Sequence, residues 1–294
     1  MADALGIAVG AFGRVALLSA TEPVQDHAHS QVHTLIKISG PDTGYSVDGQ
    51  VANLTDDQMV LVNPWVVHSN DRANDRANDR ANDRALGFQP TVLLALYIDT
   101  LWFGAQGNQI LTGVHKLPFH NVTATVSAEL RGQARHLADQ MIDLHNDEDQ
   151  FDLLLRELVF SVLHCSKTDS ISDLSTQRAF VSDPRVRKAI KSFRKEPSKE
   201  LDLDEVARSV GLSRSHFFSR FRQCTGLSPG TYIDTLCCER AASLLSDPLI
   251  TIAEISELLG FSAQSHFTRF FKSKTGITPN SFRMGHIEVG RVLR

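Results

Sequence analysis

Cysteine is scarce in this chain, with only four among 294 residues. None forms a CxxC pair or a spacing typical of zinc sites, which argues against a disulfide-stapled or zinc-ribbon protein. We expect reduced thiols, as in a cytoplasmic protein, at Cys165, Cys224, Cys237 and Cys238.

Long apolar runs are absent as well. No stretch approaches the roughly 18 to 20 uninterrupted apolar residues that a membrane-spanning helix needs. The first twenty residues are apolar but include Asp3 and lack a basic opening, unlike a cleaved leader. We therefore expect a soluble, unprocessed protein with no membrane partner. Because 294 residues exceed the usual size of one hydrophobic core, two domains are predicted.

The small net charge of −4 hides a division along the chain. Residues 1–183 hold 12 Lys and Arg against 23 Asp and Glu, a net charge of −11. Residues 184–294 hold 18 against 11, a net charge of +7. This asymmetry favours a polyanionic partner for the C-terminal part, although a solvated charge imbalance is the alternative.

Two C-terminal segments align through one inserted residue: EVARSVGLSRSHFFSRFRQCTGLSP from Glu205 and EISELLGFSAQSHFTRFFKSKTGITP from Glu254. Each predicts a first helix, a tight turn at a glycine, and a second helix that ends at a further glycine. The turn glycines are Gly211 and Gly260, and the terminal ones are Gly226 and Gly276.

Capping residues support these four helices. Asp202 stands at capping-box spacing before Glu205, and Thr251 before Glu254. Two serines are able to cap the second helices, Ser213 and Ser262. Helix, turn and helix is the arrangement that places a second helix in the DNA major groove. Two matched copies in a basic region favour this over an ordinary helical hairpin.

The stretch from about Pro184 to Met284 resembles the DNA-binding domain of the AraC/XylS family of bacterial transcription regulators, above all in AEISELLGFSAQSHFTRFFKSKTGITPNSFR. The resemblance implies seven helices, two helix-turn-helix units joined by the long helix TYIDTLCCERAASLLS, and promoter DNA and RNA polymerase as partners.

Within each second helix, spacing separates core from surface. The phenylalanine pairs four apart, Phe217 with Phe221 and Phe267 with Phe271, should face inward. The outward positions are the predicted DNA-binding residues, serving bases or phosphates: Arg214, Ser215, Ser219, Arg222, Gln264, Ser265, His266, Thr268, Arg269 and Lys272.

Before residue 126, short apolar runs alternate with turn residues, which predicts a β-sandwich or small barrel. The placement of His27, His29, His33, Gly49 and His68 resembles the cupin barrel, the sensor domain of many AraC-type regulators. In cupin enzymes such histidines and an acidic residue bind a metal, but His33 stands at the acidic position. We predict no catalytic residue and no metal. A metal-dependent cupin enzyme fused to a DNA-binding tail is the remote alternative.

The segment NDRANDRANDRANDRA, residues 70–85, places arginines four apart, and guanidinium pairs suit phosphate groups. This RxxxR series resembles the arginine motif of PilZ domains, which bind cyclic di-GMP, and GYSVDG resembles their second motif except at Gly44. The predicted ligand residues are Arg72, Arg76, Arg80, Ser46 and Gly49. A neutral expanded loop is the alternative for the repeat, and another small metabolite in the barrel is the alternative effector.

Two helices are predicted between the domains, and the second carries an apolar stripe for packing in its own domain or for a dimer interface: Phe151, Leu154, Leu155, Leu158, Val159 and Val162. The predicted fold class is α+β and multidomain. Its parts are a cupin-like sensor domain (1–125), a helical coupling or dimerisation segment (126–165), a linker (166–183), an all-α DNA-binding domain (184–286) and a tail (287–294). We expect a cytoplasmic, homodimeric, ligand-responsive activator of transcription.

Overall fold

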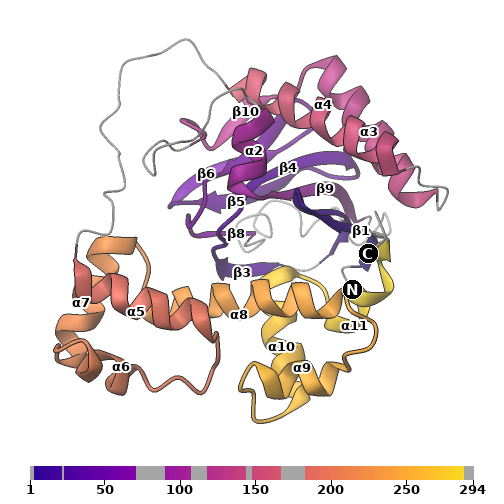
Figure 1. Cartoon of the computed structure of the whole chain (residues 1–294). Coiled ribbons are helices and arrows are strands. Elements are labelled where there is room, and N and C mark those ends of the chain that lie inside the picture. Colours follow the sequence, from indigo (N-terminus) through magenta and orange to yellow (C-terminus); the bar gives the residue numbers. More distant parts are fainter. Residues whose placement is uncertain are drawn as a thin grey trace, which may run out of the picture.

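A computed structural model of the chain describes residues 3–21, 23–70, 90–106, 118–143, 148–166 and 183–287. Figure 1 shows a β-rich N-terminal part, coloured indigo to magenta, beside an all-helical C-terminal part, coloured orange to yellow. The long helix α8 (Pro229–Leu245) runs along the side of the β-rich part that carries strand β3 (Val24–His27).

The larger sheet has seven strands in the order β10-β7-β4-β9-β2-β1-β11. Its central strand carries the run TVLLALYI, which is buried on both faces. Leu94 and Leu96 pack toward a cluster shared with helices, and Leu93 and Ala95 pack into a second cluster on the opposite face. The strands are β1 (Asp3–Gly10), β2 (Gly13–Ala20), β4 (Val32–Ser39), β7 (Gln58–Val62), β9 (Thr91–Ile98), β10 (Thr123–Thr125) and β11 (His286–Ile287).

The smaller sheet has four strands in the order β3-β8-β5-β6. Its apolar side chains Val47, Ala52 and Leu54 join Leu35 and Val60 of the larger sheet in one buried cluster. The two sheets therefore pack face to face. The remaining strands of this sheet are β5 (Thr43–Val47), β6 (Gln50–Leu54) and β8 (His68–Asn70).

Three helices cover the outer face of the larger sheet (Figure 1). The apolar stripe of the last helix is used inside this domain, because Phe151, Leu155 and Leu158 are fully buried in the cluster that the helices share with the sheet. Of the two interpretations of that stripe, the structure shows packing within its own domain. The helices are α2 (Thr100–Gln106), α3 (Ala128–Ile142) and α4 (Glu148–Ser166).

Residues 183–287 form seven helices, and α8 joins two helix-turn-helix units. The first unit is α6 and α7, and the second is α9 and α10. The helices other than α8 are α5 (Pro184–Lys195), α6 (Leu203–Ser209), α7 (Arg214–Thr225), α9 (Ile252–Leu258), α10 (Gln264–Thr275) and α11 (Pro279–Met284).

The helix caps follow the sequence except at one position. Asp202 accepts two backbone N–H bonds, Ser213 accepts the N–H of His216, and Thr251 with Glu254 forms a full capping box. The prediction that Ser262 caps α10 is wrong. The inserted residue delays the start of that helix, so Ala263 is the N-cap, and the Ser262 hydroxyl lies 2.9 Å from His266 Nδ1.

The end of the helical part returns to the sheet. Strand β11 pairs in parallel with β1, with Ile7 opposite His286, and Ile7 N donates to Gly285 O at 2.6 Å. Nothing in the sequence had indicated this return. It fastens the second helix-turn-helix unit to the N-terminal domain through the chain that follows it.

Candidate nucleic-acid interface and interdomain cavity

Helices α7 and α10 each bury one face and expose the other. All four phenylalanines predicted to face inward are 0% exposed. Of the ten predicted DNA-binding residues, Thr268 and Lys272 are half-buried, and eight are exposed: Arg214, Ser215, Ser219, Arg222, Gln264, Ser265, His266 and Arg269. Each second helix therefore offers polar side chains to a partner.

The exposed arginines of the two units differ in their contacts. Arg214 forms an ion pair with Asp204 of α6, and its guanidinium lies 4.9 Å from the ring of Phe218. Arg220 lies outside the core, 3.7 Å from Asp183. Arg269 of α10 has no carboxylate partner within the described part of the chain. Arg269 is thus more readily available to a base edge than Arg214 or Arg220.

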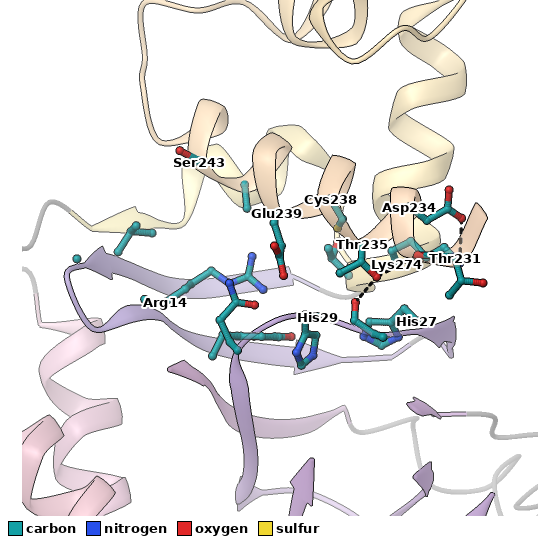
Figure 2. A pocket seen from close by; sticks show the side chains of 18 residues that line it. Arg14, His27, His29, Thr231, Asp234, Thr235, Cys238, Glu239, Ser243 and Lys274 are labelled. Carbon is teal, nitrogen blue, oxygen red and sulfur yellow. Dashed lines mark hydrogen bonds and ion pairs between the residues drawn. The ribbon is translucent and has the colours of Figure 1, made fainter. Parts of the chain in front are cut away.

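A cavity of about 240 Å³ lies between the larger sheet and α8. Figure 2 shows Arg14 and His29 projecting into it from the β-rich part and Glu239 projecting from α8. Lys274, in the last turn of α10, also lines the cavity. The remaining polar residues around it include His27, Gln31, Tyr97, Thr231, Asp234, Thr235, Cys238, Ser243 and Thr275.

Charged groups surround this cavity. The Arg14 guanidinium lies 3.9 Å above the ring of Tyr97, and no carboxylate of the described residues is within ion-pair distance of it. Glu239 accepts the backbone N–H of Ser30 at 2.6 Å, and burial raises the pKa of its carboxyl group. Lys274 donates to Asp26 O at 2.9 Å. Because Arg14 is a cation without an ion-pair partner, the cavity is suited to an anionic group.

The sequence did not indicate Arg14, Glu239 or Lys274 as site residues. One signal was available on α8, where Thr231, Thr235 and Cys238 recur at helical spacing. Partners of α8 come from the loop after β3, more than 200 positions away, as with Ala28 O for Thr235 and Ser30 N for Glu239.

Four histidines gather beside the cavity. His29 Nε2 lies 3.1 Å from His68 Nε2, the rings of His27 and His68 are 4.1 Å apart, and His33 stacks on Tyr97 at 4.2 Å. Burial lowers the pKa of His68 to about 4 and holds the pKa values of His27, His29 and His33 well below 6.5. All four are therefore neutral at pH 7.

The cysteines are free thiols. Burial raises the pKa of both Cys237 and Cys238 to about 12, which keeps them protonated. Neither is suited to act as a nucleophile.

Two of the five predicted nucleotide-binding residues, Ser46 and Gly49, lie in the described part of the chain. Ser46 lies on β5 opposite Ser69 of β8, and Gly49 occupies the following turn with φ +78°. The predicted arginines Arg72, Arg76 and Arg80 lie outside the described residues. The strand β8 ends at Asn70, the first residue of the repeat, so Ser46 is on the strand adjacent to its entry.

Residues 206–285 match the protein family described as a helix-turn-helix domain. The Msm operon regulatory protein of Streptococcus mutans is 36% identical over 109 residues, 37% of this chain and 37% of its own length. The xylose operon regulatory protein of Escherichia coli K12 is 32% identical over 115 residues, 39% of this chain and 29% of its own. The chain thus spans well under half the length of these relatives.

The fold of the whole chain is similar to that of ToxT from Vibrio cholerae, with a TM-score of 0.52 and 10% identity over 97% of each chain. None of the described helices is long and apolar enough to cross a membrane. The helix-turn-helix prediction is confirmed: the C-terminal segment matches a helix-turn-helix domain and is similar to part of two operon regulatory proteins, and it is joined here to an N-terminal sheet domain.

Proposed function

We propose that the protein is a ligand-responsive transcription regulator that binds promoter DNA through α7 and α10. The observation that carries this proposal is the pair of matched helix-turn-helix units, each with exposed polar side chains on its second helix. Arg269 and Gln264 are the best candidates to contact bases in the second unit, because Arg can pair with guanine and Gln with adenine through two hydrogen bonds.

The test is DNA affinity of the double variant Arg269→Ala with Gln264→Ala, measured on the region upstream of the protein's own gene. Each two-bond base contact contributes about 1–3 kcal/mol, so affinity should fall by at least about tenfold. Arg135→Ala removes one positive charge from an exposed position on α3, far in the sequence from α10, and serves as the control. Unchanged affinity of the double variant at physiological salt would exclude the proposed interface.

For the effector, the interdomain cavity supports a small carboxylate. Arg14 supplies a cation that has no ion-pair partner among the described residues. The cavity volume of about 240 Å³ is too small for a dinucleotide. ToxT has been solved with an unsaturated fatty acid bound, and for this chain we propose a shorter monocarboxylate with its head group at Arg14. A ligand there would contact both the sheet and α8, and so bias their arrangement.

Cyclic di-GMP, bound through Arg72, Arg76 and Arg80, is the second candidate effector. The supporting observation is the position of Ser46 on the strand beside β8, which leads into the repeat. One calorimetric series distinguishes the two candidates. Monocarboxylates of increasing chain length should bind wild type but not Arg14→Gln, whereas cyclic di-GMP should bind wild type but not Arg72→Ala with Arg76→Ala. Absence of heat with wild type would reject the candidate concerned.

We further propose that the regulator is a cytoplasmic homodimer that activates transcription together with RNA polymerase. The buried stripe of α4 is not available for dimer contact, but Leu153 and Phe160 on the same helix are 57% and 60% exposed. They are seven residues apart and so lie on one face. Analytical ultracentrifugation of Phe160→Glu against wild type tests this surface, and an unchanged dimer would exclude it.

A further inference from the structure

Three histidines converge from two segments of the smaller sheet. His27 ends β3, His29 follows in the next loop, and His68 begins β8. One ring nitrogen from each lies within 4.8 Å of the others. His29 and His68 are 7% and 2% exposed, and His27 is half-buried at the rim of the interdomain cavity.

Backbone carbonyls fix the protonation of two of these rings. His27 Nδ1 lies 2.8 Å from Gln25 O, and His68 Nδ1 lies 3.0 Å from Val66 O. A carbonyl only accepts, so each Nδ1 must carry the hydrogen, and each Nε2 is left with a lone pair. Metal-binding histidines show this same arrangement, in which the second ring nitrogen donates to a carbonyl or carboxylate.

The third ring is short of partners. His29 Nδ1 is buried and has no hydrogen-bond partner among the described residues, while its Nε2 lies 3.1 Å from His68 Nε2. A tetrahedral zinc site with Zn–N bonds of 2.0–2.1 Å holds its nitrogens about 3.3 Å apart. The His29–His68 pair is already close to that spacing, and the His27 nitrogen, within 4.8 Å of the other two, is the one that must move closer.

We propose that His27, His29 and His68 bind a divalent transition-metal ion of the zinc, cobalt and nickel class. Three imidazole nitrogens favour these ions over Mg²⁺ and Ca²⁺, which prefer oxygen ligands. Three protein ligands leave one position open, and His27 and His29 both line the cavity, so that position faces the cavity. His33 remains stacked on Tyr97 and is not a ligand.

The charges around the three histidines are mixed. Arg14 and Lys274 oppose the positive charge of an ion bound there, whereas Asp26 favours it. Because the three ligands are neutral, the ion would add two positive charges beside the cavity, which further favours an anionic group in the open position.

The histidine-bearing loop is also where the C-terminal domain attaches. Thr235 Oγ1 donates to Ala28 O at 3.0 Å, Ser30 N donates to Glu239, and Lys274 donates to Asp26 O. An ion held by His27, His29 and His68 would fix the loop that α8 and α10 contact. Metal binding is therefore expected to raise the melting temperature of the full chain.

The experiment uses tag-free, full-length protein stripped of metal with EDTA, titrated with Zn²⁺ by calorimetry and with Co²⁺ by absorption spectroscopy. Wild type should bind one ion per chain, with the visible spectrum of tetrahedral cobalt, and should gain thermal stability. His29→Gln should weaken Zn²⁺ binding at least about 100-fold. His27→Gln, at the half-buried rim, is the second variant, and circular dichroism verifies that both are folded.

The matched control is His136→Ala with His164→Ala, two exposed histidines of α3 and α4. It should leave the stoichiometry and the cobalt spectrum unchanged. Binding of less than one equivalent by wild type, or a loss of binding in the control and not in His29→Gln and His27→Gln, would overturn the proposal. Neither result depends on DNA, so failure here leaves the proposed regulator function untouched.

Discussion

The two helix-turn-helix units have the same local design but different support. Their turn glycines have nearly equal φ angles, +72° at Gly211 and +71° at Gly260, and both bury a pair of phenylalanines. In the second unit, Phe267 and Phe271 belong to a cluster that continues into both sheets. The core of the first unit is mostly its own, with Ala28 as its one fully buried contribution from the N-terminal domain.

Beside the first unit, α5 and the start of α8 meet the N-terminal domain through a small contact. The ring of Trp65 stacks on that of Tyr232 at 4.4 Å and 2°, and Arg194 lies 5.9 Å from the Trp65 ring. Local sequence therefore determines the structure of each unit, whereas tertiary packing determines how firmly each is held to the sheet. The second unit is the anchored one, and the first has more freedom to be repositioned.

The largest expected effect comes from truncating one core phenylalanine in each unit. Phe221→Ala and Phe271→Ala should each cost about 3–5 kcal/mol of stability, since both side chains are fully buried. In a Trp65→Phe background, fluorescence of Trp102 on α2 reports on the N-terminal domain. Phe271→Ala should shift the unfolding transition followed by Trp102 fluorescence and also the one followed by circular dichroism of the helices. Phe221→Ala should shift only the circular dichroism transition. Equal shifts of Trp102 fluorescence would contradict the difference in support.

The sequence predicted features that depend on a few neighbouring residues. The turns at Gly211 and Gly260, the caps at Asp202 and Thr251, and the inward phenylalanines all follow from short-range spacing. The prediction that Ser262 caps α10 was wrong because one inserted residue shifts the start of that helix. This shift is too small for hydrophobic periodicity to show.

Features that join distant segments were not predictable in the same way. The run TVLLALYI is apolar throughout, so its sequence does not show which side chains face the helices and which the smaller sheet. The pairing of β11 with β1 and the contact of Ser30 with Glu239 depend on the docking of two domains. The histidines were recognised as a group from their spacing, but only the structure shows which three converge.

The turn glycines offer a second, smaller test. A Cβ at Gly211 meets nothing within 4 Å, so Gly211→Ala should cost only the strain of a positive φ, about 1 kcal/mol. A Cβ at Gly260 would lie 2.2 Å from Ser198 Oγ and 3.0 Å from Glu200 N, in the loop before α6. Gly260→Ala should therefore lower the free energy of unfolding more than Gly211→Ala does, as measured by urea denaturation. Ser198→Ala combined with Gly260→Ala should recover part of the difference, and equal costs of the two single variants would refute the packing of that loop on the second turn.

The smallest effect concerns the charges that support the first unit. Asp183 caps α5, accepting the N–H of Arg185 at 2.9 Å and its guanidinium at 2.8 Å, and lies 3.7 Å from Arg220 of α7. These bonds from Arg185 lower the pKa of Asp183 to about 2. A carboxyl group with a lowered pKa stabilises the fold above its unfolded pKa near 3.8, and this stabilisation is lost as pH falls toward 2.

Asp183→Ala should cost about 1 kcal/mol at pH 7, because it removes the cap, and Asp183→Asn less, because asparagine also caps. The stability difference between wild type and Asp183→Asn should shrink between pH 4 and pH 2, measured by urea unfolding of the helices. Phe271→Ala is the matched control, since an apolar core contact contributes equally across that range. A wild type to Asp183→Asn difference that is the same at pH 7 and pH 3 would mean that the charge of Asp183 does not support the first unit.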